Sequence, residues 1–389
     1  MNTRDTLAMD RRSAIKWGTA LTVGATLSAR WESLFALEPG EEALPFLNEP
    51  NTPPARLDWV GLKDWLTPQD QVFNVQHYSV PEIAPEDYQL TITGAVENPR
   101  TYSLEQLRAL PSVRQPMTLE CAGNGASKGF SNAVYNSEWT GAALGPILEA
   151  AGLSADAEEV VFLGADTKVE TLREGSRSEL SVEVPFGRSL SVEDAMNEPA
   201  LIAYARNDAP LEVRNGAPVR LIMPGWYGVA NVKWLTRIEV RKSRYMGRYM
   251  ARDYVTVRGE EKDGKMLYHE SSVAKMNLKS VVARVSRKAD GRLSAFGAVW
   301  GDGTPIERVE VSIDGGAWRV AAIDVEPFDP YSWRFFRFDL GSLAAGTHRI
   351  VSRATDVKGR VQPTNDAPEI ANKKTYWEAY AQWPREFEI

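Results

Sequence analysis

Residues 118–130 read TLECAGNGASKGF and contain the only cysteine of the 389-residue chain. Met117, Leu119 and Cys121 alternate with polar residues, so the pattern predicts a strand that ends at the cysteine, where Gly123-Asn124-Gly125 turns the chain. The turn lacks the Lys-Ser/Thr ending of a phosphate-binding loop, and its glycines miss the dinucleotide spacing. A lone thiol at such a turn is either a small buried core residue or a soft ligand for a transition metal.

The bulk composition restricts the kinds of site that the chain can form. Apolar residues make up 43% and charged residues 25%, as in ordinary globular proteins, and the net charge of −7 argues against nucleic-acid binding. No segment approaches the ~18 uninterrupted apolar residues of a membrane span. One cysteine excludes an internal disulfide, and His77, His269 and His348 lack zinc-ligand spacing. A metal centre would therefore need a cofactor that supplies most of its ligands.

The amino-terminal region has the layout of an export signal. Arg11 and Arg12 precede a short, mildly apolar run, which predicts a twin-arginine signal within residues 1–38 and a periplasmic protein exported in the folded state. Asp10 and Ala14 depart from the usual pattern, so an ordinary amphipathic start is the alternative. Residues 39–72 are rich in Pro, Glu and Asn and predict an extended segment that wraps around the rest.

Periodicity in the middle of the chain predicts short strands and helices in irregular order. Residues 88–93 alternate as a half-buried strand does, residues 103–111 have a capping box and a proline stop, and residues 141–152 show helical spacing that ends in glycine. Residues 158–166 and 217–226 predict buried strands that emerge into turns with a polar residue. Without a regular βαβ rhythm, this region, residues 73–277, is predicted to be α+β.

The pattern changes after about residue 278. Two alternating runs in residues 308–324 are joined at Asp314-Gly315-Gly316, which is a strong hairpin signal. Further alternating runs follow with no helical period before the tail. Residues 278–389 therefore predict an immunoglobulin-like β-sandwich without a disulfide.

Two stretches together resemble a known family. LECAGNG (residues 119–125) and NGAPVRLIMPGWYGVANVKWLTRIEV (residues 215–240) are similar to motifs of the sulfite oxidase family of molybdenum enzymes. The similarity extends from about Phe73 to the C-terminus. It implies a molybdopterin-binding α+β domain over residues 73–277, a dimerisation domain of immunoglobulin-like form over residues 278–389, a mononuclear molybdenum–molybdopterin cofactor and a possible homodimer.

The resemblance also implies a role for individual residues. Cys121 is the expected protein ligand of molybdenum, and Tyr254 is expected to form a hydrogen bond near the reacting oxygen. Arg220 and Lys233 are cations within apolar strands, so each needs an anionic partner such as the pterin phosphate. The full set expected to bind the cofactor is Phe73, His77, Cys121, Asp166, Asn215, Arg220, Asn231, Val232 and Lys233. Outside the family pattern, these are ordinary core, turn or surface residues.

The chain departs from the family pattern where sulfite-oxidising members place arginines around the dianion. The corresponding positions here are Val75, Gly125-Ala126 and Thr304, while Arg308 lies close to the last of these but out of register. Lys128 either reaches inward or is solvated. The sequence therefore predicts a complete metal site whose anion pocket is largely lost.

The expected activity is two-electron oxygen-atom transfer at a small sulfur-containing substrate, as in a sulfite dehydrogenase. The electrons would pass to an external carrier, either a c-type cytochrome or a membrane haem or quinone subunit. Reduction of a neutral sulfoxide is one alternative, because it needs no arginines. A non-catalytic exported binding module with a degenerate site is the other.

Overall fold

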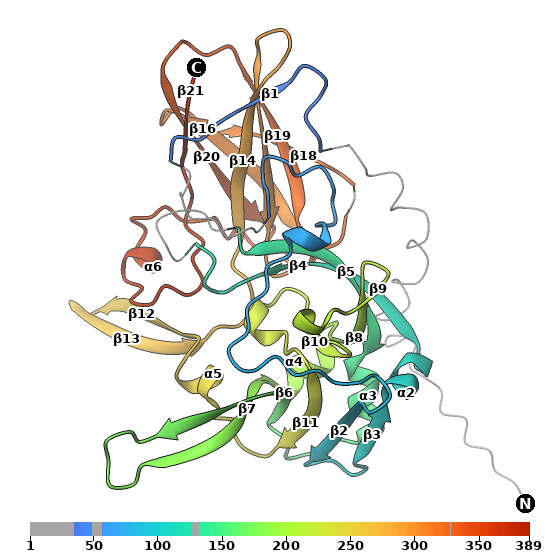
Figure 1. Cartoon of the computed structure of the whole chain (residues 1–389). Helices are drawn as coiled ribbons and strands as arrows, with labels where there is room; N and C mark the ends of the chain where they lie inside the picture. The colour runs from blue at the N-terminus through green and yellow to red at the C-terminus, as the bar shows by residue number, and fades with distance from the viewer. Residues whose placement is uncertain (1–34, 49–56, 126–131, 327) are drawn as a thin grey trace, which may run out of the picture.

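The computed structural model describes residues 35–48, 57–125, 132–326 and 328–389 (Figure 1). Most of the predicted export signal lies outside these residues, as do Ala126 and Lys128. No helix in the described part of the chain is both long and apolar enough to cross a membrane. Two regions follow one another: an α+β domain from β2 to β13, and a sandwich from β14 to β21, to which the early strand β1 is added.

The α+β domain contains two five-stranded sheets, and its helices are few and short. One sheet has the order β10-β8-β5-β4 with β9 paired to β8; the other has the order β3-β2-β11-β6-β7. Only β2 and β11 pair in parallel among the named strands of these sheets. The strands are β2 (Gln89–Gly94), β3 (Arg100–Ser103), β4 (Ser112–Glu120), β5 (Val134–Ala143), β6 (Glu159–Leu172), β7 (Leu180–Ser191), β8 (Leu201–Arg206), β9 (Ala209–Pro210), β10 (Arg220–Ile222) and β11 (Leu235–Arg241).

Short helices and one two-stranded ribbon complete this domain. The helices are α2 (Leu104–Ala109), α3 (Leu144–Ala151), α4 (Val192–Asn197), α5 (Arg248–Ala251), and the 3-10 turns η2 (Gln69–Gln71), η3 (Val213–Asn215) and η4 (Gly228–Ala230). The ribbon pairs β12 (Val255–Lys262) with β13 (Lys265–Ser272) and projects from the domain in Figure 1. The predicted α+β class is confirmed, with strand strongly outweighing helix.

Local sequence signals placed several of these elements correctly. The predicted capping box at the start of α2 is present: Ser103 Oγ accepts from the Gln106 N–H, and the Gln106 side chain accepts from the Ser103 N–H. Helix α3 ends at Gly152, whose φ of 68° is accessible to glycine at little cost. One expectation was wrong. Asp166 does not lie in a turn after a strand, because β6 continues to Leu172 through a register shift between Leu163 and Thr167.

The sandwich packs two antiparallel sheets face to face, as predicted. Its sheets have the orders β1-β14-β15-β19-β18 and β17-β16-β20-β21, and the hairpin predicted at residues 314–316 joins β16 to β17. The interior is apolar, with Val282, Val311, Phe336 and Phe387 fully buried. The strands are β1 (Glu42–Leu44), β14 (Lys279–Arg287), β15 (Leu293–Trp300), β16 (Ile306–Ile313), β17 (Arg319–Val320), β18 (Ala322–Ile323), β19 (Arg334–Gly341), β20 (Thr347–Asp356) and β21 (Arg385–Glu388).

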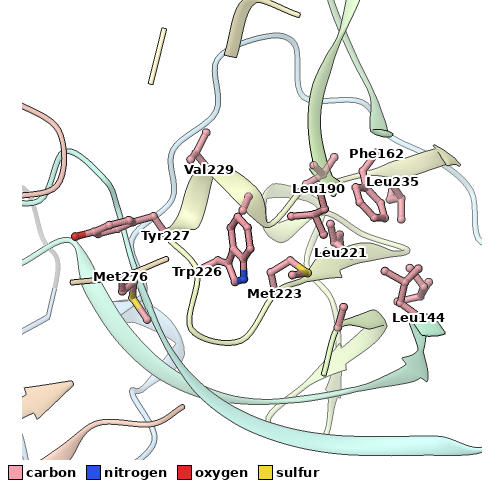
Figure 2. Close-up of a cluster of buried hydrophobic side chains, with 14 of the residues drawn as sticks. Leu144, Phe162, Leu190, Leu221, Met223, Trp226, Tyr227, Val229, Leu235 and Met276 are labelled. Carbon is pink, nitrogen blue, oxygen red and sulfur yellow. The ribbon is translucent and has the colours of Figure 1, made fainter. Parts of the chain in front are cut away.

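The segment before β2 ties the two regions together. Trp65 Nε1 donates to the Trp333 carbonyl (3.2 Å) and Trp333 Nε1 donates to the Trp65 carbonyl (3.0 Å). Trp59 stacks on Trp300 of β15 with ring centroids 6.2 Å apart. One apolar cluster extends across the junction, and Figure 2 shows part of it around Trp226 and Met223. The two regions therefore share a continuous core.

A buried carboxylate fixes the end of β4 against the sandwich. Glu120 is fully buried and lies one residue before Cys121. Its carboxylate accepts hydrogen bonds from Trp300 Nε1 (2.9 Å) and Asn124 Nδ2 (2.8 Å), and it pairs with Lys279 Nζ at the start of β14. Because a buried charge needs such partners, the position of Cys121 depends on the sandwich.

We predict that Lys279→Ala destabilises the protein by about 3–5 kcal/mol, because it leaves the Glu120 carboxylate buried without its cation. Chemical denaturation would measure the loss. Lys242→Ala is the matched control, since Lys242 pairs with Asp156 at the surface and should leave unfolding unchanged. Equal stability of the two variants would contradict the assigned role of Glu120.

Candidate molybdopterin site

A partly open cavity lies beside Cys121. All the predicted site residues except Val232 line it: Phe73, His77, Cys121, Asp166, Asn215, Arg220, Asn231, Lys233 and Tyr254. Val232 lies in the core instead, and its carbonyl accepts from the Leu221 N–H (2.8 Å). The fold thus brings together residues that lie far apart in the sequence.

Backbone hydrogen bonds hold Cys121 at the end of β4. Its N–H donates to the Ala133 carbonyl (3.0 Å), and its carbonyl accepts from the Asn124 N–H (2.8 Å). The Asn124 side chain accepts from the Ala133 N–H (3.1 Å) and thereby closes the turn. Cys121 is partly exposed, and a Cβ added at Gly123 would lie 3.9 Å from the sulfur. Small residues thus leave room for a bulky group beside the thiol.

His77 and Tyr254 form a neutral pair on one side of the cavity. The Tyr254 hydroxyl lies 2.9 Å from His77 Nε2. Burial lowers the pKa of His77; Asp253 opposes this shift, and the charges of Lys233 and Arg248 add to it. Burial and the neighbouring Cys121 raise the pKa of Tyr254. At neutral pH the imidazole therefore carries no charge and the phenol keeps its proton. The pair can hold or pass on one proton.

Aromatic packing fixes the orientation of this pair. The His77 ring stacks on Tyr249 at 4.8 Å and on Phe186 at 5.8 Å. Tyr254 has a φ of 56°, a left-handed conformation that costs a non-glycine residue about 1–3 kcal/mol. Stacking on Trp377 at 4.2 Å accompanies this strained conformation. A strained backbone conformation persists only where the surrounding structure holds it, so the packing around Tyr254 fixes its position.

Arg220 is a buried cation without a carboxylate partner among the described residues. Its guanidinium donates to the carbonyls of Asn215 (2.9 Å) and Asn231 (3.0 Å), and it lies over the Trp139 ring. Its Nε is buried without a hydrogen-bond partner. Burial lowers the pKa of Arg220, which expresses the cost of keeping this charge away from water.

Lys233 and Asp166 likewise have fewer hydrogen-bond partners than their polar atoms could bind. Lys233 Nζ donates to Asn74 Oδ1 and to the Arg214 carbonyl, both at 3.0 Å, and burial lowers its pKa to about 7. Burial raises the pKa of Asp166 to about 6, and its Oδ1 has no hydrogen-bond partner. That oxygen lies so close to Gly164 that a Cβ there would approach it to 2.3 Å. A buried carboxylate, a buried arginine and a partly buried lysine therefore line the cavity, and each could still form hydrogen bonds to a ligand.

These residues fit a molybdopterin cofactor. An anionic phosphate would satisfy Arg220 and Lys233, pterin N–H groups would satisfy Asp166, and the Cys121 thiolate is a soft ligand suited to a metal. Within the described residues, no three His, Cys, Asp or Glu side chains gather as a metal cluster. A metal here would accordingly take most of its ligands from the cofactor.

Comparison with known proteins agrees with this chemistry. The oxidoreductase molybdopterin binding domain matches residues 77–249, and the Mo-co oxidoreductase dimerisation domain matches residues 268–377. The chain belongs to the sulfite oxidase family. The cofactor of the family is molybdopterin-bound molybdenum, and this chain carries both characteristic domains in the family order.

The similarity to individual family members covers most of the chain. Mitochondrial sulfite oxidase of Drosophila melanogaster is 31% identical over 345 residues, which is 78% of this chain but 56% of that protein. Sulfite oxidase of Arabidopsis thaliana is 28% identical over 339 residues, 78% of this chain and 84% of that protein. The sulfane dehydrogenase SoxCD from Paracoccus pantotrophus is 25% identical, with a TM-score of 0.71 over 89% of this chain and 90% of that one. The chain thus spans little more than half the length of the Drosophila protein.

Several cavity residues were not predicted from the sequence. Asn74, Tyr135, Phe186 and Trp234 line the cavity as well. Asn74 had a signal, because it directly follows Phe73 in the stretch that carries His77. The aromatic residues had none, since an aromatic within a buried strand is indistinguishable from ordinary core.

The structure also locates the positions where the family arginines are missing. Val75 lines the cavity and is 42% exposed. Arg308 pairs with Glu307 (2.9 Å) and Glu310 (3.5 Å) on the sandwich, and neither Arg308 nor Thr304 lines the cavity. Among the described lining residues, the basic side chains other than His77 are Arg220 and Lys233, and both have the hydrogen-bond partners described above.

We predict that the cofactor-free protein becomes more stable between pH 7 and pH 9 and that Lys233→Met loses about 1–2 kcal/mol of this gain. Folding lowers the pKa of Lys233 from 10.5 to about 7, so the unfolded state binds more protons in this range and the free energy of unfolding rises with pH. Urea unfolding at several pH values would measure it. Identical pH profiles for the variant and the wild type would show that Lys233 is not desolvated.

Proposed function

We propose that this protein is a molybdenum-dependent oxidoreductase that oxidises a sulfur compound of low negative charge and passes the electrons to an external carrier. The single observation that carries the proposal is the distribution of charge in the cavity. Arg220 and Lys233 interact with one another, and Lys233 interacts with Asp166, whereas Cys121 lies near Tyr254, which is hydrogen-bonded to neutral His77. A dianion such as sulfite would lose its hydration there without gaining paired cations.

Each residue has a distinct task in this proposal. Cys121 would bind the metal, Arg220 and Lys233 would bind the phosphate, and Asp166 would accept from pterin N–H groups. The bound cofactor supplies two-electron redox chemistry and oxygen-atom transfer at sulfur. Tyr254 would donate a hydrogen bond to the substrate, and His77 would exchange a proton with that hydroxyl through their hydrogen bond. Each oxidation adds one water-derived oxygen to sulfur and releases two protons and two electrons.

The relatives support a sulfur substrate without fixing which one. Sulfite is named for the animal and plant relatives, and sulfane for the structural relative from Paracoccus pantotrophus. Of the two, a sulfane sulfur agrees better with a cavity that has lost its arginines. The carrier would be a c-type cytochrome or a membrane haem or quinone subunit, the protein would function in the periplasm after twin-arginine export, and the sandwich would form a homodimer.

Reduction of a neutral sulfoxide is a second candidate that one observation favours. This reaction consumes two protons and two electrons and releases water, so it needs a proton donor beside the metal. Tyr254 keeps its proton at neutral pH, because burial raises its pKa. A non-catalytic module is disfavoured, because it would have no reason to keep Arg220 and Lys233 buried at such cost.

We predict that the purified protein contains about one molybdenum per chain and that Cys121→Ser has one sulfur fewer around the metal. X-ray absorption spectroscopy would show the missing sulfur, and turnover of sulfur compounds should fall at least about a hundredfold. A serine variant with an unchanged metal spectrum would rule out Cys121 as ligand. Protein made in cofactor-competent cells yet free of molybdenum would support the non-catalytic module.

We predict that wild-type turnover of sulfite is weak and that Val75→Arg lowers its KM about two- to fivefold, the range expected for a partly solvated charge pair. The gain should shrink at high ionic strength, since salt screens exposed charges. Val75→Met controls for side-chain size. A low micromolar KM for sulfite in the wild type would contradict the proposed charge distribution.

A further inference from the structure

The C-terminal part of the chain returns from the sandwich to the turn that carries Cys121. After the short helix α6 (Pro368–Ala371), residues 372–379 run beside the ribbon strand β12, as Figure 1 shows for the red segment at α6. The Gly259 N–H donates to the Asn372 carbonyl (3.1 Å), and the Lys374 N–H donates to the Val257 carbonyl (2.9 Å). These bonds fix the start of the segment to the α+β domain.

A second anchor fixes the other end of the segment to the Cys121 turn. The Glu378 N–H donates to the Ala122 carbonyl (2.8 Å), and its buried carboxylate accepts from Thr256 Oγ1 (2.6 Å) and Arg258 Nη2 (2.8 Å). Lys373 Nζ donates to the carbonyls of residues 377 (2.6 Å) and 378 (3.1 Å). Residues between the two anchors therefore have little freedom to move away from the cysteine.

Two aromatic residues, Tyr376 and Trp377, lie between these anchors. Trp377 stacks on Tyr254 with centroids 4.2 Å apart, and the Tyr376 ring lies 4.0 Å from that of Trp377. A Cβ added at Gly123 would lie 3.6 Å from both rings and 3.9 Å from the Cys121 sulfur. Both rings therefore border the small space beside the thiol.

The exposure of Tyr376 places this pair at the rim of the site. Tyr376 is 54% exposed, whereas Tyr254, at the inner end of the stack, is 5% exposed. The stack thus extends from the cavity wall to solvent.

Aromatic rings at this position favour particular substrates. Their faces carry partial negative charge, so they attract polarisable sulfur and apolar groups but give no compensation to an anion. We propose that Tyr376 and Trp377, together with Tyr254, form an aromatic wall at the approach to Cys121 that selects sulfur substrates with an apolar substituent or a second sulfur over free sulfite. The inference rests on the proposed function, because it concerns the substrate of the same site.

The wall can be tested by binding as well as by turnover. Methyl phenyl sulfone and sulfate would be titrated into the molybdenum-loaded protein by calorimetry, as an apolar and an anionic probe. Trp377→Ala should weaken sulfone binding about tenfold and change sulfate binding less than about twofold, while Trp377→Phe retains sulfone binding. Tyr376→Ala, at an exposed position that folding tolerates, should weaken sulfone binding in the same direction.

Trp318→Ala is the matched control, since Trp318 is a half-buried tryptophan at the β16–β17 hairpin of the sandwich, packed under Arg353. The proposed aromatic wall would be refuted if Trp377→Ala and Tyr376→Ala weakened the binding of both probes equally, or weakened neither. Turnover separates this result from the function proposed above. If the protein turns over organic sulfur compounds but Trp377→Ala does not change its preference for them over sulfite, the proposed function stands and the proposed aromatic wall is refuted. If sulfone binding depends on Trp377 but the protein turns over no sulfur compound, the aromatic wall stands and the proposed function is refuted.

Discussion

The position of Cys121 depends on a buried carboxylate that two regions of the chain share. Glu120 is fully buried, and its partners Lys279 and Trp300 belong to the sandwich, while Asn124 belongs to the turn after the cysteine. A carboxylate in an apolar interior is stable only when such partners stay in place. Separation of the sandwich from the α+β domain would therefore expose this carboxylate or leave it buried without its cation, and it would displace the thiol. The sandwich thus contributes to the site directly, in addition to any part it has in dimer formation.

The cavity combines two electrostatic environments, and both follow from burial. On one side, Arg220 is buried and Lys233 partly buried, and neither forms a close ion pair among the described residues, although Asp166 lies near Lys233; both therefore favour an anionic ligand. On the other side, burial removes the charge of His77 and keeps the proton of Tyr254. Binding of an anionic cofactor would relieve the first environment, and it would offset the lowering of the His77 pKa by Lys233 in the second. Folding stability and cofactor binding are therefore coupled through the cations.

Sequence patterns predicted what depends on neighbouring residues and failed where distant segments meet. The α2 capping box and the hairpin at residues 314–316 are local, and the structure has both. The bulge that places Asp166 inside β6 depends on pairing with β7, which no periodicity reports. Family motifs located most of the cavity, yet Tyr376 and Trp377 reach Cys121 across about 250 residues of sequence. Hydrogen bonds to β12 and to the Ala122 carbonyl hold these two rings near Cys121, and no local sequence pattern predicts those bonds.

The missing arginines and the aromatic stack have one physical explanation. An arginine at the position of Val75 would add a positive charge near His77, whose pKa the charges of Lys233 and Arg248 already lower. The rings of Tyr254, Tyr376 and Trp377, by contrast, give a bound anion no compensating charge. A cavity wall of neutral, polarisable groups and a wall of paired cations are therefore alternative solutions, because each weakens the ligand preference of the other. A cation at position 75 alone would accordingly give only a modest gain for sulfite, and a full change of preference would also need the loss of the rings.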